Sequence, residues 1–203
     1  NVEGSPTYSS PSNGIVERAI QAVEGQVRGL RSALETRWGL KLTRECRIWP
    51  WMVEMAGLQL NRGEVGHDDK TAYERSEGKK CRIHGTEFGE GVWWRRRPIG
   101  GALGKLSSLW DDGIFLGIKA TTGEFMIGGK IGARRTRTIQ WRPIEERWLP
   151  ENFEFFGGVP WRVSDDDPKT DGEPMQAVKL SEEERKRMAD EMQWKERRRR
   201  HLE

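Results

Sequence analysis

The clearest pattern of apolar and polar positions lies between residues 14 and 34. Apolar side chains recur there at steps of three and four residues: Val16, Ile20, Val23, Val27, Leu30 and Leu34. This spacing predicts one buried face of a helix. A polar stripe runs beside it: Glu17, Gln21, Glu24, Arg28 and Arg31. The preceding Pro11-Ser12-Asn13-Gly14 segment is typical of a turn, so we predict that Glu17 lies in the first helical turn.

A second helix is predicted after a break at Gly39. Pro50 fits its first turn, where a missing backbone N–H is tolerated. The positions of its apolar face are Trp49, Met52, Val53, Ala56, Gly57 and Leu60. The Asn61-Arg62-Gly63 segment ends this helix. Residues 63–86 are polar and are expected to form a linker, with a short helix near residues 72–76.

Short alternating segments replace the helical pattern after Glu87. Strands are expected at residues 92–95, 113–119, 124–128 and 133–141, with a turn at Thr122-Gly123. Short strands broken by glycine at this spacing are typical of a small barrel. We therefore predict a small β-barrel over residues 87–143.

The remaining sequence is looser and more strongly charged. Residues 144–180 are predicted to be linker or disorder, because residues 157–179 hold glycine, proline and three consecutive aspartates. A charged helix is predicted over residues 181–203, where Ser181 and Glu184 have the spacing of a capping box. Its apolar face is thin, so we expect it to be solvated or to fold on a partner.

Composition narrows the functional classes. Hydrophobic residues make up 34% of the 203-residue chain and charged residues 33%, which predicts small cores. The sequence has neither a run that would span a bilayer nor a secretory signal pattern, so we expect no membrane partner and a nuclear or cytoplasmic location rather than secretion. Because the chain begins at Asn1 rather than at methionine, we expect a fragment of a longer protein.

The two cysteines, Cys46 and Cys81, do not make a disulfide framework. Cys81 and His84 have the spacing of half a zinc site. A structural zinc site takes four ligands, and the second half of such a site is missing. We therefore do not predict a zinc site.

Arginine is clustered although the net charge is only +3. The basic runs are residues 95–97, residues 134–137 and residues 197–200. Arginine stays charged and pairs with phosphate through two hydrogen bonds, so such runs are candidates for nucleic-acid contact. The alternative is that they form solubilising faces, or guard strand edges against aggregation.

The order of residues from Ser10 to Arg18 resembles the last catalytic motif of retroviral and retrotransposon integrases. In that family a Pro-x-Asn-Gly turn leads into a helix that carries the glutamate of an Asp-Asp-Glu triad. The resemblance implies a ribonuclease-H-like core in which Glu17 is the catalytic glutamate and Asn13 belongs to the turn. It also implies that Glu17 is a ligand of Mg²⁺ in the complete integrase.

The resemblance continues to about residue 80. Integrases of long-terminal-repeat retrotransposons have a core helix that ends in Asn-Arg, here Asn61-Arg62, followed by a Thr-Pro-Tyr-Glu segment and Gly-Lys. Residues 70–75, Lys-Thr-Ala-Tyr-Glu-Arg, and Gly78-Lys79 resemble these, with Ala72 in place of the proline. Residues 88–141 look like the small barrel that follows the core. Copia-type and gypsy-type elements both remain open.

The two triad aspartates of the family precede the glutamate. Only sixteen residues precede Glu17, and none is aspartate. The aspartates at 68, 69, 111 and 112 come later and do not replace them in that topology. We therefore expect a chain that does not catalyse integration alone and does not hold Mg²⁺ tightly, and whose partners are DNA and the missing upstream core or other integrase protomers.

The predicted fold class is α+β, with the C-terminal helices of a truncated ribonuclease-H-like integrase core over residues 1–62, a small SH3-like β-barrel and a charged helical tail. The predicted DNA contacts are Asn13, Arg18, Arg28, Arg31, Arg95, Arg96, Arg134 and Arg135. Two rival hypotheses are a non-catalytic chromatin reader that holds a methylated lysine in an aromatic cage, and an inactive structural remnant.

Overall fold

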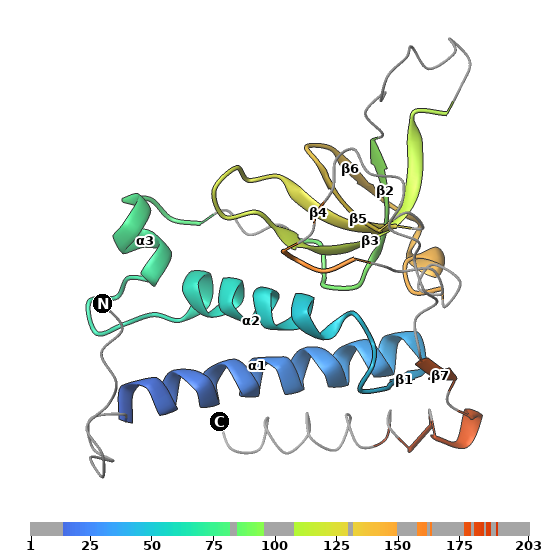
Figure 1. Ribbon diagram of the computed structural model, residues 1–203, viewed down its shortest axis with the longest axis horizontal. Coiled ribbons are helices and arrows are strands. Elements are labelled where there is room, and N and C mark those ends of the chain that lie inside the picture. The colour runs from blue at the N-terminus through green and yellow to red at the C-terminus, as the bar shows by residue number, and fades with distance from the viewer. Residues whose placement is uncertain are drawn as a thin grey trace.

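The computed structural model describes residues 14–81, 85–95, 108–129, 132–149, 158–161, 163, 177–179, 181–184, 186–187 and 190. Two helices lie side by side beneath a twisted antiparallel sheet (Figure 1). The α+β class predicted from the sequence is confirmed. The more specific assignments, a ribonuclease-H-like core for the helices and an SH3-like barrel for the strands, remain predictions.

The two long helices lie close to where the apolar periodicity predicts them. Helix α1 spans Gly14–Trp38 and has Glu17 in its first turn. It extends beyond Leu34 because Trp38 continues the apolar face by one turn, and both side chains are buried. Helix α2 spans Trp49–Gly63 with proline near its start. The chain reverses between them, so α2 packs back along α1.

A short helix, α3, spans Ala72–Glu77 as predicted, and its capping explains the Thr-x-Tyr-Glu segment. The Glu74 backbone N–H donates to Thr71 Oγ1 over 3.1 Å, and the Thr71 N–H donates to a Glu74 carboxylate oxygen over 2.8 Å. Ala72 occupies the first helical position, where proline is equally well tolerated. Gly78 ends the helix with a φ of 68°. The threonine and glutamate of this segment therefore start a helix.

The sheet has five strands in the order β5-β4-β3-β2-β6, all antiparallel. Their bounds are β2 Gly91–Arg95, β3 Trp110–Ile118, β4 Phe125–Gly129, β5 Gly132–Thr136 and β6 Ile139–Trp141. The fourth predicted strand, residues 133–141, is two strands, because the chain bends at Arg137 and then pairs with β2 instead of β4. A 3₁₀ turn, η2 (Ile144–Glu146), follows.

A second, two-stranded sheet was not predicted. Strand β1 (Leu40–Leu42) pairs with β7 (Ala177–Lys179), which lies in the range predicted to be linker or disorder. Three residues are too few for apolar alternation to identify a strand. The end of the predicted linker is thus tied back to the α1–α2 connection.

One buried cluster joins the helices to the sheet. It contains Trp51 and Met52 of α2 together with Ile114 and Leu116 of β3. The indole N–H of Trp51 also donates to the carbonyl of Gly158 over 3.1 Å. A smaller cluster contains Val92, Trp94, Phe115 and Ile127. The helix pair therefore covers one face of the sheet, and the two predicted units share a core.

The start of the predicted C-terminal helix is present. Residues 182–184, 186, 187 and 190 have helical backbone. The Ser181 N–H donates to a Glu184 carboxylate oxygen over 3.0 Å, and the Glu184 N–H donates to Ser181 Oγ over 3.3 Å, so the predicted capping box is confirmed. Among the helices that the structure describes, none is both long and apolar enough to cross a bilayer.

Candidate functional site

Glu17, the predicted catalytic and metal-binding residue, is exposed on the first turn of α1. Arg18 beside it donates from Nε to the carbonyl of Gly14 over 3.2 Å, so it helps to hold that turn. Within the described parts of the chain, no three histidine, cysteine or carboxylate side chains come together as metal ligands. Asn13 lies outside the described residues. Glu17 is therefore a single acidic group at the start of a long helix.

The apolar face of α1 is buried only in its second half. Leu34 and Trp38 are buried, but Ile15, Val16 and Ile20 are 77%, 58% and 53% exposed. The prediction of one continuous buried stripe is therefore wrong for the first two turns. Helix α2 has 15 residues and α1 has 25, so at about 1.5 Å per residue α2 covers only about 22 Å of a helix about 37 Å long. An apolar surface that the described residues leave uncovered thus lies next to Glu17.

The arginines of the α1 polar stripe differ in their surroundings. Arg28 forms only a loose pair with Glu24 at 3.6 Å, and both side chains are mostly exposed. Arg31 donates to Glu35 over 2.9 Å and lies over the ring of Trp49. The same Glu35 oxygen accepts from the backbone N–H of Leu42 over 3.0 Å. Arg28 is thus presented to solvent, whereas Arg31 helps to attach β1 to α1.

Two of the arginine runs meet at one end of the sheet. The N–H of Arg95 donates to the carbonyl of Thr138 over 3.1 Å, and Thr136 Oγ1 donates to the carbonyl of Arg95 over 3.3 Å. These bonds bring Arg95 beside the Thr136–Thr138 bend, where the Arg137 side chain is 81% exposed and lies 3.6 Å from a carboxylate oxygen of Glu124. Arg137 belongs to the basic run at residues 134–137 but is not among the predicted DNA contacts, because the sequence does not show where the bend lies.

Arg134 and Arg135 lie on β5 opposite Ile127 and Met126 of β4, and both are half-buried with partners inside the chain. Arg96 lies outside the described residues. Figure 1 shows the start of α1 and the outer end of β2 on opposite sides of the molecule. The predicted DNA contacts therefore form two separate groups, one on α1 and one at this end of the sheet.

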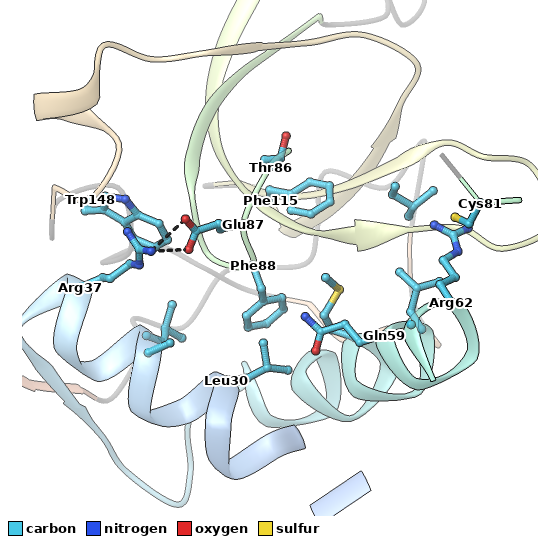
Figure 2. Close-up of a pocket in the computed structure, with 16 residues that line it drawn as sticks. Leu30, Arg37, Gln59, Arg62, Cys81, Thr86, Glu87, Phe88, Phe115 and Trp148 are labelled. Atoms are coloured by element: carbon cyan, nitrogen blue, oxygen red, sulfur yellow. Dashed lines mark hydrogen bonds and ion pairs between the residues drawn. The ribbon is translucent and has the colours of Figure 1, made fainter. Parts of the chain in front are cut away.

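A cavity of about 440 Å³ lies between the helix pair and the sheet (Figure 2). Apolar side chains make most of its wall: Leu30 and Leu34 of α1, Met55 and Leu58 of α2, and Phe115 and Ile118 of β3. Phe88, just before β2, points between the helices and the sheet. No sequence motif identifies this cavity, because its walls come from segments far apart in the chain.

Each end of the cavity has an arginine. At one end Arg37 pairs with Glu87 at 2.7 Å and lies over the ring of Trp148, 4.8 Å from its centroid. At the other end Arg62 lies over the ring of Tyr73 at 5.3 Å, near Cys81 (Figure 2). Arg37 is thus already paired with a carboxylate.

Two ion pairs hold the turn after β6 against β2 and β3. Glu90 is 2% exposed; one carboxylate oxygen accepts from the Glu87 N–H over 2.8 Å, and the other lies 3.1 Å from Arg147 Nη1. Arg142 pairs with Asp112, one of the aspartates that follow Glu17 in the chain, and lies over the ring of Trp93. Asp112 of β3 is therefore paired with an arginine that lies just after β6.

The two cysteines are predicted to differ sharply in reactivity. Neither forms a disulfide. Cys46 is buried, and burial raises the pKa of its thiol from 9.0 to about 11, which lowers its thiolate fraction about a hundredfold. Cys81 is half-buried at the cavity. We expect an aromatic disulfide reagent at pH 8 to titrate Cys81 in the native protein and Cys46 only after unfolding; equal rates for both thiols in the native protein would contradict this assignment.

Comparison of this chain with protein-family models, with curated proteins and with solved structures found no match.

Proposed function

We propose that this chain is the C-terminal part of an integrase of a long-terminal-repeat retrotransposon, and that it binds DNA during integration. Its helices belong to a ribonuclease-H-like catalytic core, its sheet is a small SH3-like domain, and its charged C-terminal segment extends from them. Glu17 is one ligand of Mg²⁺ in the complete integrase. The chain itself is not catalytic, because both triad aspartates belong to the upstream part of the core.

The observation that carries this proposal is the first half of α1. Glu17 is exposed there beside Ile15, Val16 and Ile20, apolar side chains that nothing in the described parts of the chain covers. A globular domain seldom leaves a helical apolar stripe in water, because burying each such side chain is worth about 1.5–3 kcal/mol. A core sheet packed on this face would cover the stripe and would bring its own carboxylates toward Glu17.

The sheet supports the second part of the proposal. A meander of β2, β3, β4 and β5 is completed by β6, which returns to pair with β2. The sheet is open, but the bonds between Arg95, Thr136 and Thr138 hold the end of β2 beside the end of β5, which is compatible with the proposed barrel-like domain. This contact places Arg95 and Arg137 at one end of the sheet, where guanidinium groups can pair with phosphates.

DNA binding through these arginines predicts a steep response to salt. We expect affinity for a short labelled duplex, measured by fluorescence anisotropy, to fall as salt rises from about 50 to 200 mM, because phosphate contacts release counterions. The Arg95→Gln and Arg137→Gln double variant is expected to reduce the slope of log K against log salt by about 2, roughly 1 for each lost contact.

The matched control is Arg44→Gln, which removes an exposed arginine in the turn between β1 and α2. It is expected to keep the wild-type slope. A flat salt response of the wild-type chain, or an equal loss in the control, would contradict phosphate binding at the sheet.

The surroundings of Trp148 and Glu87 disfavour the chromatin-reader hypothesis. Trp148 and Glu87 are the kind of side chains that hold a methylated lysine, but Arg37 of the same chain lies over the ring and pairs with the carboxylate. Binding of a methylated histone peptide without any DNA binding would reverse this preference.

A further inference from the structure

Two polar side chains of α2 face the cavity without a polar partner in the described parts of the chain. Gln59 and Arg62 lie three residues apart, and therefore on one face of the helix. Arg62 contacts the ring of Tyr73, but no carboxylate of the described residues lies within ion-pair distance of its guanidinium. The Gln59 amide has no hydrogen bond within those residues and points into the cavity (Figure 2). The α2 side of the cavity thus offers hydrogen-bond donors and a positive charge.

The opposite end of the cavity is neutral. There Arg37 is matched by Glu87, with Nη2 2.7 Å from one carboxylate oxygen and 2.9 Å from the other. Among the lining residues that the structure describes, the uncompensated charge is therefore the single positive charge of Arg62. Between the two ends the wall is mostly apolar, with Leu34 of α1 and Phe88 and Phe115 of the sheet side.

This pattern selects an amphiphile with one negative end. We propose that the cavity binds a small organic carboxylate whose apolar chain or ring lies between the helix pair and the sheet, and whose carboxylate pairs with Arg62. The volume of about 440 Å³ falls within the range of pockets that enclose small ligands, about 300–1,000 Å³. The inference does not depend on DNA binding, because neither Arg95 nor Arg137 lines the cavity.

The charge pattern disfavours the other simple ligands. A cationic amphiphile would meet Arg62 without a free carboxylate, since Glu87 is already paired. A neutral alcohol of the same length would fill the apolar part but would leave the guanidinium without a charged partner. Hydrogen bonds to charged groups are stronger than neutral ones, so we expect the carboxylate to bind about tenfold more tightly than the alcohol.

Isothermal titration of the full chain with decanoate and with decanol, each below its aggregation concentration, tests the proposal. Wild-type protein is expected to bind decanoate about tenfold more tightly than decanol. Arg62→Gln removes the charge from a partly exposed position and should reduce decanoate affinity to that of decanol, with decanol affinity unchanged. Arg44→Gln makes the same charge change outside the cavity and should bind as the wild type does.

A second variant tests the location of the apolar part. Ala33 lines the cavity from α1, and Ala33→Phe would place a ring in the empty space without a residue that breaks the helix. It should abolish binding of both probes while circular dichroism shows an unchanged helix content. Absence of decanoate binding to wild-type protein, equal affinity for the two probes, or full binding by Arg62→Gln would each overturn the proposal.

Discussion

Replacing Glu90 with alanine is expected to lower the free energy of unfolding by about 2–4 kcal/mol, as measured by urea denaturation. The carboxylate is almost fully buried, accepts a backbone hydrogen bond and lies against Arg147. Its removal leaves the Glu87 N–H without its acceptor and leaves Arg147 without its carboxylate, although Arg147 Nε still donates to the carbonyl of Arg142. Loss of one member of a fully buried ion pair costs about 3–5 kcal/mol. We expect a somewhat smaller loss here because the Arg147 side chain is 31% exposed.

The matched control is Glu87→Ala, three residues earlier. Glu87 also pairs with an arginine, but both side chains are about half exposed, so the expected loss is below about 1 kcal/mol. Equal effects of the two substitutions would show that Glu90 does not hold the turn after β6 in place.

The wild-type chain should unfold cooperatively in urea, because one core joins the helices to the sheet. Non-cooperative unfolding would favour the hypothesis of a structural remnant.

Helices were predictable where the signal was local and long. The apolar repeat of α1 covers most of its 25 residues, and Thr71 and Glu74 encode the start of α3 within four residues. Strands β2, β3 and β4 were predictable because glycines and alternation mark them, whereas β5 and β6 were predicted as one strand. Strands β1 and β7 were not, because each has three residues and gains its stability from a partner far along the chain.

The role of a polar side chain was harder to predict than its secondary structure. Glu35 continues the polar side of α1, and nothing in the sequence shows that Leu42 returns to donate a hydrogen bond to it. That contact makes Glu35 a buried acceptor and holds Arg31, which was predicted to contact DNA. The cavity with Gln59 and Arg62 was missed for the same reason: tertiary packing, and no local pattern, brings its walls together.

If the chain is joined to the upstream core that we propose, Glu17→Gln should have the largest effect on function. Glutamine keeps the shape of the side chain but is neutral, and hard cations such as Mg²⁺ prefer carboxylate oxygens. Two such ions, about 3.5–4 Å apart, clamp the attacking and leaving oxygens in phosphodiester transfer. Loss of an outer partner of a metal ligand already costs about 10–100-fold, so loss of the ligand itself should reduce strand transfer at least about 100-fold.

The control for this substitution lies on the same helix. Glu24→Gln removes the same charge from the same polar stripe two turns later, where the carboxylate forms only a loose surface pair with Arg28. Both variants should keep the salt-dependent DNA binding of the parent, because neither removes a cation. The two variants should therefore differ in strand-transfer activity although they bind DNA with the same affinity. If Glu17→Gln and Glu24→Gln were equally active in the complete protein, Glu17 would be an ordinary first-turn acid stabilised by the helix dipole, and the proposed integrase ancestry would lose its central residue.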